Sequence, residues 1–159
     1  MSFDSFFASE YDRVVRSLLL AFGDRLTAED AAQEAFSLAL VPWSRVSQMD
    51  RPEAWVYVVA LRYGRRRAKR LSLSSPPSFS GQDSGEETDF TNRIVIVDLL
   101  ARLAPRQRQA VVLRYHADLT LEQVAAALGC RVGTVKATLN QALDRLRELS
   151  QGESLYGNH

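Results

Sequence analysis

Apolar residues recur at three- and four-residue intervals along two long stretches of the chain, and this spacing constrains the fold more than any other sequence feature. From about Phe3 to Leu71, and again from Ile94 to Leu149, the spacing is that of amphipathic α-helices. No alternating strand pattern bounded by hairpin turns accompanies it. The sequence therefore predicts an all-α protein.

Local signals place the helix ends of the first stretch. Gly23 predicts the end of the first helix, because glycine adopts the left-handed backbone that closes a helix. Thr27 and Asp30 form a box-like start for a second helix. A third helix is expected to begin near Asp50, with Pro52 in its first turn.

The segment 72–93 separates the two helical stretches. It contains two adjacent prolines and many serines, and it has too few apolar residues to offset the entropy of ordering. We therefore expect two small helical domains, 1–71 and 94–159, joined by a flexible linker over 72–93.

Other features exclude several classes of protein. One cysteine and two histidines supply neither an internal disulfide nor a structural zinc site. The chain has no long apolar run and no signal-peptide pattern at its start, so we expect a cytoplasmic protein without membrane insertion. No nucleophile triad, phosphate loop or pair of carboxylates in a cleft stands out. We expect no enzyme, no catalytic residues, no metal and no cofactor.

The formal net charge of +1 is an average over unlike segments. Residues 1–53 contain nine acidic and five basic side chains, whereas 54–71 contain six basic and no acidic ones. Residues 72–98 contain five acidic and one basic, and 99–159 contain five acidic and eight basic. Such blocks act over about a Debye length, roughly 8–10 Å, so either basic block could hold a polyanion despite the low total.

The stretch from Leu119 to Leu149 reads as a helix-turn-helix. Thr120 and Gln123 form a capping box, and Gly129 ends the first helix. The second helix begins near Val132 and leaves one face for base edges in a major groove. Together with the preceding turn, the candidate DNA-binding residues are Arg131, Gly133, Thr134, Lys136, Ala137, Asn140 and Gln141. An ordinary helical hairpin is the alternative.

The longer C-terminal segment resembles region 4 of bacterial sigma factors, which reads the promoter −35 element. The matching residues are Leu103, Pro105, Arg108, Leu113, Arg114, Tyr115, Leu119, Thr120, Gln123, Val124, Ala125, Leu128, Gly129, Gly133, Thr134, Val135 and Lys136. The family usually has a serine where Arg131 stands and often basic residues where Thr138 and Gln141 stand, which predicts weaker non-specific DNA affinity.

The N-terminal half resembles region 2.2 of extracytoplasmic-function (group IV) sigma factors. The matching residues are Ala28, Glu29, Asp30, Gln33, Glu34 and Phe36. The resemblance implies that this helix docks on the largest subunit of core RNA polymerase. Asp30, Gln33 and Glu34 lie within one turn and would present charge and hydrogen-bond acceptors to a partner helix.

Residues 51–70 resemble regions 2.3 and 2.4, which contact and open the −10 element. Aromatic rings and cations are interleaved here, and these two groups capture a separated strand by stacking and by pairing with phosphates. The candidate −10 residues are Tyr57, Arg62, Tyr63, Arg65, Arg66, Arg67 and Lys69. Trp55 and Tyr57 point to different helix faces, and we expect Trp55 to be the core residue. Tyr63 and Gly64 depart from the asparagine and aliphatic residue that are common in the family.

The resemblance implies an alternative sigma factor that binds core RNA polymerase and directs promoter-specific transcription initiation. Its partners would be core polymerase and promoter DNA, and an anti-sigma factor is left open as a further partner. Two alternatives also stay open: a stand-alone helix-turn-helix regulator, and a sigma-like module that titrates an anti-sigma factor.

Overall fold

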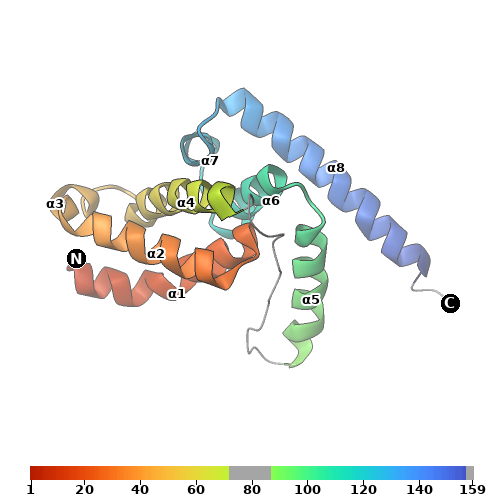
Figure 1. Cartoon of the computed structure of the whole chain (residues 1–159), viewed down its shortest axis with the longest axis horizontal. Coiled ribbons are helices and arrows are strands. Elements are labelled where there is room, and N and C mark those ends of the chain that lie inside the picture. Colours follow the sequence, from red (N-terminus) through yellow and green to blue (C-terminus); the bar gives the residue numbers. More distant parts are fainter. Residues whose placement is uncertain (72–86, 157–159) are drawn as a thin grey trace.

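A computed structural model describes residues 1–71 and 87–156, and over these residues the chain is all-α, as predicted (Figure 1). The elements are α1 (Phe3–Phe22), α2 (Arg25–Leu40), α3 (Trp43–Val46), α4 (Pro52–Leu71), α5 (Glu87–Ala101), α6 (Pro105–Val111), the π-helical turn η1 (Val112–His116), α7 (Leu121–Leu128) and α8 (Val132–Tyr156). None of the described helices is long and apolar enough to cross a membrane.

Helix ends follow local chemistry, with one correction. Gly23 adopts the predicted left-handed backbone, at φ 71°, and its N–H donates to the Leu19 carbonyl. The predicted start of the second helix at Thr27 is wrong, because Asp24 is the N-cap and accepts from the backbone N–H groups of Leu26 and Thr27. The aspartate lies just before the helix, where a carboxylate satisfies two N–H groups that have no partner within the helix.

Helix α5 begins at Glu87, inside the range 72–93 that we assigned to the linker. The sequence of its first turns, ETDFT, is polar and lacks the apolar spacing on which the assignment relied. Residues 72–86 lie outside the described part of the chain.

The N-terminal half packs α1, α2 and α4 around buried side chains, chief among them Leu18, Phe36 and Leu61. Trp43, in α3, closes one end of this bundle, with its ring centroid 5.0 Å from that of Phe6. Gly64, in the middle of α4, faces the ring of Phe22, and a Cβ there would lie only 2.4 Å from that ring. The glycine that departs from the family pattern therefore makes room for an aromatic side chain of α1.

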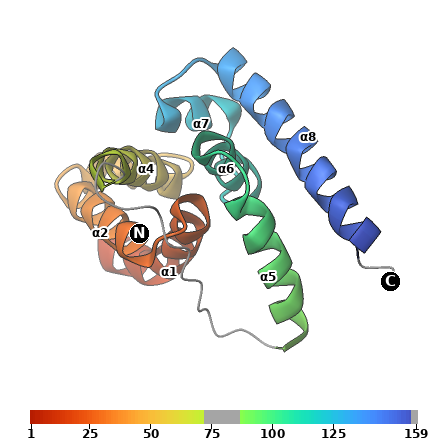
Figure 2. The ribbon, with the colours of Figure 1, turned by 45° about the vertical axis from the view of Figure 1, so that its right-hand side comes forward.

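In the C-terminal half, α6 and η1 form a nearly continuous helix that contacts both α7 and α8, and α5 lies beside α8 (Figures 1 and 2). The capping box of Thr120 and Gln123 is present at the start of α7, as predicted. Gly129 ends α7 with a left-handed backbone at φ 66°. After this turn, α8 packs against both α6 and α7.

The two halves pack against each other and share one apolar core. Helix α4 contacts α7, and α1 contacts both α6 and η1 (Figure 2). A single cluster of buried residues runs from Phe6 and Leu18 in α1 to Leu113 and Leu128 near the helix-turn-helix. The two helical regions therefore behave as one packed unit in this structure.

We predict that Gly64→Ala destabilises the chain. The new methyl group overpacks against buried Phe22, which costs about 1–3 kcal/mol, and the better helix propensity of alanine returns about 1 kcal/mol. Urea denaturation should give a net loss of free energy of unfolding. The matched control is Gly152→Ala in α8, where a Cβ meets no atom within 4 Å and no loss is expected. Equal effects of the two substitutions would contradict this packing.

Candidate polymerase and promoter interfaces

The N-terminal part of α8 presents the predicted −35 residues to solvent. Val135, Leu139 and Ala142 of the same helix are buried against α6 and α7. The opposite face is open, and all seven predicted residues on it and in the preceding turn are exposed: Arg131, Gly133, Thr134, Lys136, Ala137, Asn140 and Gln141. The structure thus brings this predicted set together on one surface.

Thr138 has a different environment from the one that the family comparison suggested. It is only 9% exposed and belongs to the buried face of α8. Position 138 faces the core here, so the absence of a positive charge does not remove a phosphate contact. The expected loss of non-specific affinity then rests on Gln141 alone.

The predicted polymerase-binding residues of α2 differ in exposure. Gln33 is exposed, whereas Asp30 and Glu34 are half-buried. The Asp30 carboxylate forms an ion pair with Arg67 of α4, which was predicted as a −10 residue. The pair joins α2 to α4 and holds both side chains in place.

Exposed apolar side chains flank this acidic face, and our sequence reading missed them. Leu26 is 59% exposed, Leu40 52% and Val41 93%. Leu26 and Leu40 stand seven residues on either side of Gln33, so the three share a face. The helical spacing places these apolar residues outside the core, and this feature of the sequence could have predicted an apolar contact surface.

Tyr57 is a core residue, which corrects its assignment to the −10 surface. It is 1% exposed, and its hydroxyl lies 3.1 Å from the Ser17 hydroxyl. Burial raises the pKa of the Tyr57 phenol, and the hydrogen bond with Ser17 partly offsets this. Trp55, expected in the core, is only half-buried. The packing angle of α4 on α1 decides which aromatic ring is enclosed, and spacing alone does not give that angle.

Two of the predicted −10 arginines contact the other half of the molecule. The Arg62 guanidinium donates to the Ala126 carbonyl from Nε at 3.0 Å and from Nη2 at 2.8 Å. Arg65 donates to the Leu128 carbonyl at 2.6 Å. Both acceptors lie in the last turn of α7, where carbonyls have no partner within the helix and the helix dipole is negative.

The rest of the −10 set differs in exposure. Arg66 is exposed and donates to the Arg62 carbonyl one turn earlier, at 3.3 Å. Tyr63 is partly buried against the core, and Lys69 is exposed. The structure therefore does not gather the seven predicted residues on one open face, as it does for the −35 set.

Two further arginines cross the joint between the halves. Arg51, oriented by an ion pair with Glu53 at 2.9 Å, donates to the carbonyls of Ala117, at 3.1 Å, and Asp118. In the opposite direction, the Arg108 guanidinium donates to the Ala21 carbonyl near the end of α1 at 2.9 Å. Burial lowers the pKa of the Arg108 guanidinium. Arginines from each half thus cap helix ends in the other.

A neutral hydrogen bond completes this joint. The Ser17 hydroxyl lies 2.7 Å from Nδ1 of His116, at the end of η1. Burial, together with the nearby positive charge of Arg16, lowers the pKa of His116 below the ordinary histidine value of 6.5. The interface therefore favours the neutral imidazole.

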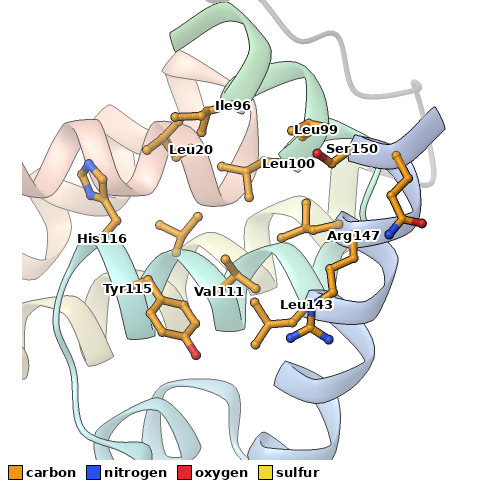
Figure 3. Close-up of a pocket in the computed structure, with 13 residues that line it drawn as sticks. Leu20, Ile96, Leu99, Leu100, Val111, Tyr115, His116, Leu143, Arg147 and Ser150 are labelled. Atoms are coloured by element: carbon orange, nitrogen blue, oxygen red, sulfur yellow. The ribbon is translucent and has the colours of Figure 1, made fainter. Parts of the chain in front are cut away.

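An apolar groove with a volume of about 690 Å³ borders the joint (Figure 3). Leu20 and His116 line its inner end, Ile96, Leu99 and Leu100 come from α5, and Leu143 and Arg147 come from α8 (Figure 3). The walls of this groove come from segments far apart in the chain, so no local sequence pattern predicts it.

Comparison with known proteins assigns the chain to a family. Residues 99–148 match the family model of sigma-70 region 4. Over 98% of the chain and 88% of the relative, the sequence is 31% identical to the RNA polymerase sigma-E factor of Streptomyces avermitilis. It is also 31% identical to the ECF sigma factor SigL of Mycobacterium tuberculosis, over 83% of the chain and 79% of that protein. The chain belongs to the extracytoplasmic-function sigma factors.

The solved structures agree in fold with this sigma factor. One neighbour is the sigma factor RpoE from Bartonella quintana in complex with the anti-sigma factor NepR, with a TM-score of 0.70, 21% identity and 94% of this chain and 96% of that chain covered. Another is CnrH in complex with the cytosolic domain of CnrY, with a TM-score of 0.63, 18% identity and coverage of 94% and 88%. Both similarities support two helical domains.

The family assignment confirms the function that the sequence predicted, that of an RNA polymerase sigma factor. As a sigma factor, the protein acts with core RNA polymerase and promoter DNA in transcription initiation. The family consists of non-catalytic transcription initiation factors.

The pKa of His116 generates a prediction of pH dependence. Because its folded-state pKa is lower than in the unfolded chain, the neutral side chain contributes stability that is complete above about pH 6.5 and is lost as pH falls through the folded pKa. The free energy of unfolding should therefore decrease between pH 7 and pH 5 by more in the wild type than in His116→Gln. Parallel pH profiles for the two proteins would contradict the assignment.

Proposed function

We propose that the three surfaces of this sigma factor divide its work. The exposed face of α2 around Gln33 and Glu34 docks on core polymerase, α4 engages the −10 element, and the N-terminal part of α8 reads the −35 element. Catalysis belongs to polymerase, and the protein acts in the cytoplasm.

One observation carries the −35 assignment furthest. All seven residues that the helix-turn-helix pattern selects are exposed, six on one side of α8 and Arg131 in the turn before it. Val135, Leu139 and Ala142 on the other side of the helix hold it on the core. The short turn after Gly129 sets α8 across α7, which is the arrangement in which the second helix enters a major groove.

The −10 assignment rests on charge and on position. Helix α4 carries Arg62, Arg65 and Arg66 within little more than one turn, and no acidic side chain lies among residues 54–71. A positively charged helix of this kind attracts the phosphates of a displaced strand. Tyr57 is left out because it is buried, and Arg67 contributes by holding Asp30 and α2 in place.

The docking assignment to α2 combines charge and apolar area. Gln33 and Glu34 supply polar groups that fix the orientation of a partner helix, and Leu26 and Leu40 supply area that becomes buried on binding. We also infer that an anti-sigma factor is a partner, since the RpoE structure contains one. A role limited to titrating an anti-sigma factor drew its support from the absence of basic residues at positions 138 and 141. Thr138 is buried, so a basic residue at that position would not contact DNA, and this alternative loses half of its support.

We predict that Lys136→Glu lowers promoter-specific transcription. Loss of a phosphate or base contact costs about 1–3 kcal/mol of promoter binding, which is roughly 5- to 150-fold in affinity, and the reversed charge adds repulsion. The measurement is run-off transcription with core polymerase from a promoter selected on genomic DNA. The control is Arg145→Glu, an equal reversal at another exposed position of α8, about two and a half turns further on, which should retain activity. Unchanged activity of Lys136→Glu would exclude this face as the −35 reader.

The α2 surface makes a separate prediction. Gln33→Lys places a positive charge at the centre of the proposed docking face and should weaken binding to core polymerase several-fold in a pull-down titration. Glu122→Lys, on the exposed side of α7, is the matched control and should bind as the wild type does. If Gln33→Lys binds core normally, the polymerase contact lies elsewhere.

A further inference from the structure

The turn between η1 and α7 leads directly into the helix-turn-helix. It consists of residues 117–120, and Thr120 at its end is the N-cap of α7. Asp118 has a φ of 57°, and among the described residues other than glycine it alone has a positive φ. The N–H of the next residue, Leu119, donates to the Leu113 carbonyl of η1 at 3.0 Å. The chain therefore reverses tightly at the end of η1, in a backbone conformation that aspartate adopts less readily than glycine.

Arginine side chains satisfy three consecutive carbonyls of this turn. The Arg51 guanidinium donates to the carbonyls of Ala117, at 3.1 Å, and Asp118. The Arg114 guanidinium donates from Nη1 to the Leu119 carbonyl at 2.9 Å. Leu119 is fully buried, and a buried carbonyl without a partner costs free energy comparable to a lost hydrogen bond. The bond from Arg114 therefore stabilises this backbone path.

The direction of α7 affects the face that α8 presents. Helix α7 has eight residues and is about 12 Å long at about 1.5 Å per residue, and it runs from this turn to the left-handed Gly129. Val135 and Leu139 of α8 are buried, and α8 packs on both α6 and α7. A change in the direction of α7 therefore tilts the N-terminal part of α8 relative to α6.

We propose that Arg114 is a positioning residue for promoter reading. Its bond to the Leu119 carbonyl fixes the direction in which α7 begins, and through α7 it sets the angle of the proposed −35 face. Both groups belong to the C-terminal half, five residues apart, so the bond does not depend on how the N-terminal half is placed. The inference deepens the proposed −35 role of α8 and rests on it.

A tilt of α8 affects the two kinds of DNA contact differently. A hydrogen bond to a base edge weakens steeply as its angle departs from linear, whereas the attraction between a cation and a phosphate changes slowly with distance. Base contacts carry the sequence information, and phosphate contacts do not. Loss of the Arg114 bond should therefore lower the preference for the correct −35 element more than the general affinity for DNA.

Three roles of an arginine give different results in a DNA titration. Loss of a phosphate contact weakens binding to all sequences alike and lowers the salt slope by about one. Loss of folding stability alone lowers the active fraction and leaves both the slope and the sequence preference unchanged. Loss of a positioning residue lowers the sequence preference while the slope stays the same.

The test titrates holoenzyme, assembled from the full chain and core polymerase, with two fluorescent duplexes at several salt concentrations. One duplex is a promoter selected on genomic DNA, and the other is the same promoter with a scrambled −35 element. Arg114→Met should lower the affinity ratio of the two by about fivefold or more, the lower end of what one lost base contact costs, with the wild-type salt slope. Arg145→Met, which removes an exposed arginine paired with Glu148 within α8, is the matched control and should keep the ratio.

Asp118 allows a second perturbation of the same turn. Asp118→Val and Asp118→Gly remove the same carboxylate, but only valine, which is β-branched, is strained at a φ of 57°. Asp118→Val should lower the affinity ratio as Arg114→Met does, and Asp118→Gly should bind as the wild type does. Circular dichroism checks that each variant is folded, and this pair decides the question if Arg114→Met is unfolded.

An unchanged affinity ratio in either Arg114→Met or Asp118→Val would overturn the positioning role. A salt slope lowered by about one in Arg114→Met would also overturn it, because that result indicates a phosphate contact. Lys136→Gln in the same titration tests the proposed function separately. If Lys136→Gln keeps both the ratio and the slope, the −35 role of α8 fails; if it lowers either while Arg114→Met keeps both, only the positioning role fails.

Discussion

Arginine guanidinium groups that cap the carbonyl ends of helices hold the two halves of this sigma factor together. Arg62 and Arg65 reach from α4 to the last turn of α7, and Arg108 reaches back to the end of α1. The last carbonyls of a helix lack partners within it, and a planar cation with several donors satisfies them across an interface. The apolar core continues beneath these contacts, so packing and capping act on the same joint.

This joint decides which surfaces are available to partners. The proposed −35 face of α8 points away from it and is open, whereas the basic face of α4 lies partly within it. The apolar groove between α5 and α8 borders it through His116. Arg62, Arg65 and His116 therefore belong to the same joint, while the proposed −35 face of α8 lies outside it.

Features that depend on residues close together in the chain could be predicted from the sequence, whereas features that depend on contacts between distant segments could not. The capping box at Thr120 and the glycine ends at Gly23 and Gly129 are local, and they were predicted correctly. The start of α2 was misplaced because two residues three positions apart, Asp24 and Thr27, can both cap a helix, and the charged one does so here. The early start of α5 was missed because its first turns are polar and carry no apolar spacing.

The same distinction separates the candidate sites. The sequence by itself determined the helical class, the family resemblance and the open face of α8, because apolar periodicity over one helix selects which residues are buried and which are exposed. Only the tertiary structure decided that Tyr57 and not Trp55 is enclosed, that Thr138 faces the core, and that Arg62 and Arg65 cap α7. Those outcomes depend on the angle and distance between helices far apart in the chain, which packing and capping fix and which no local pattern encodes.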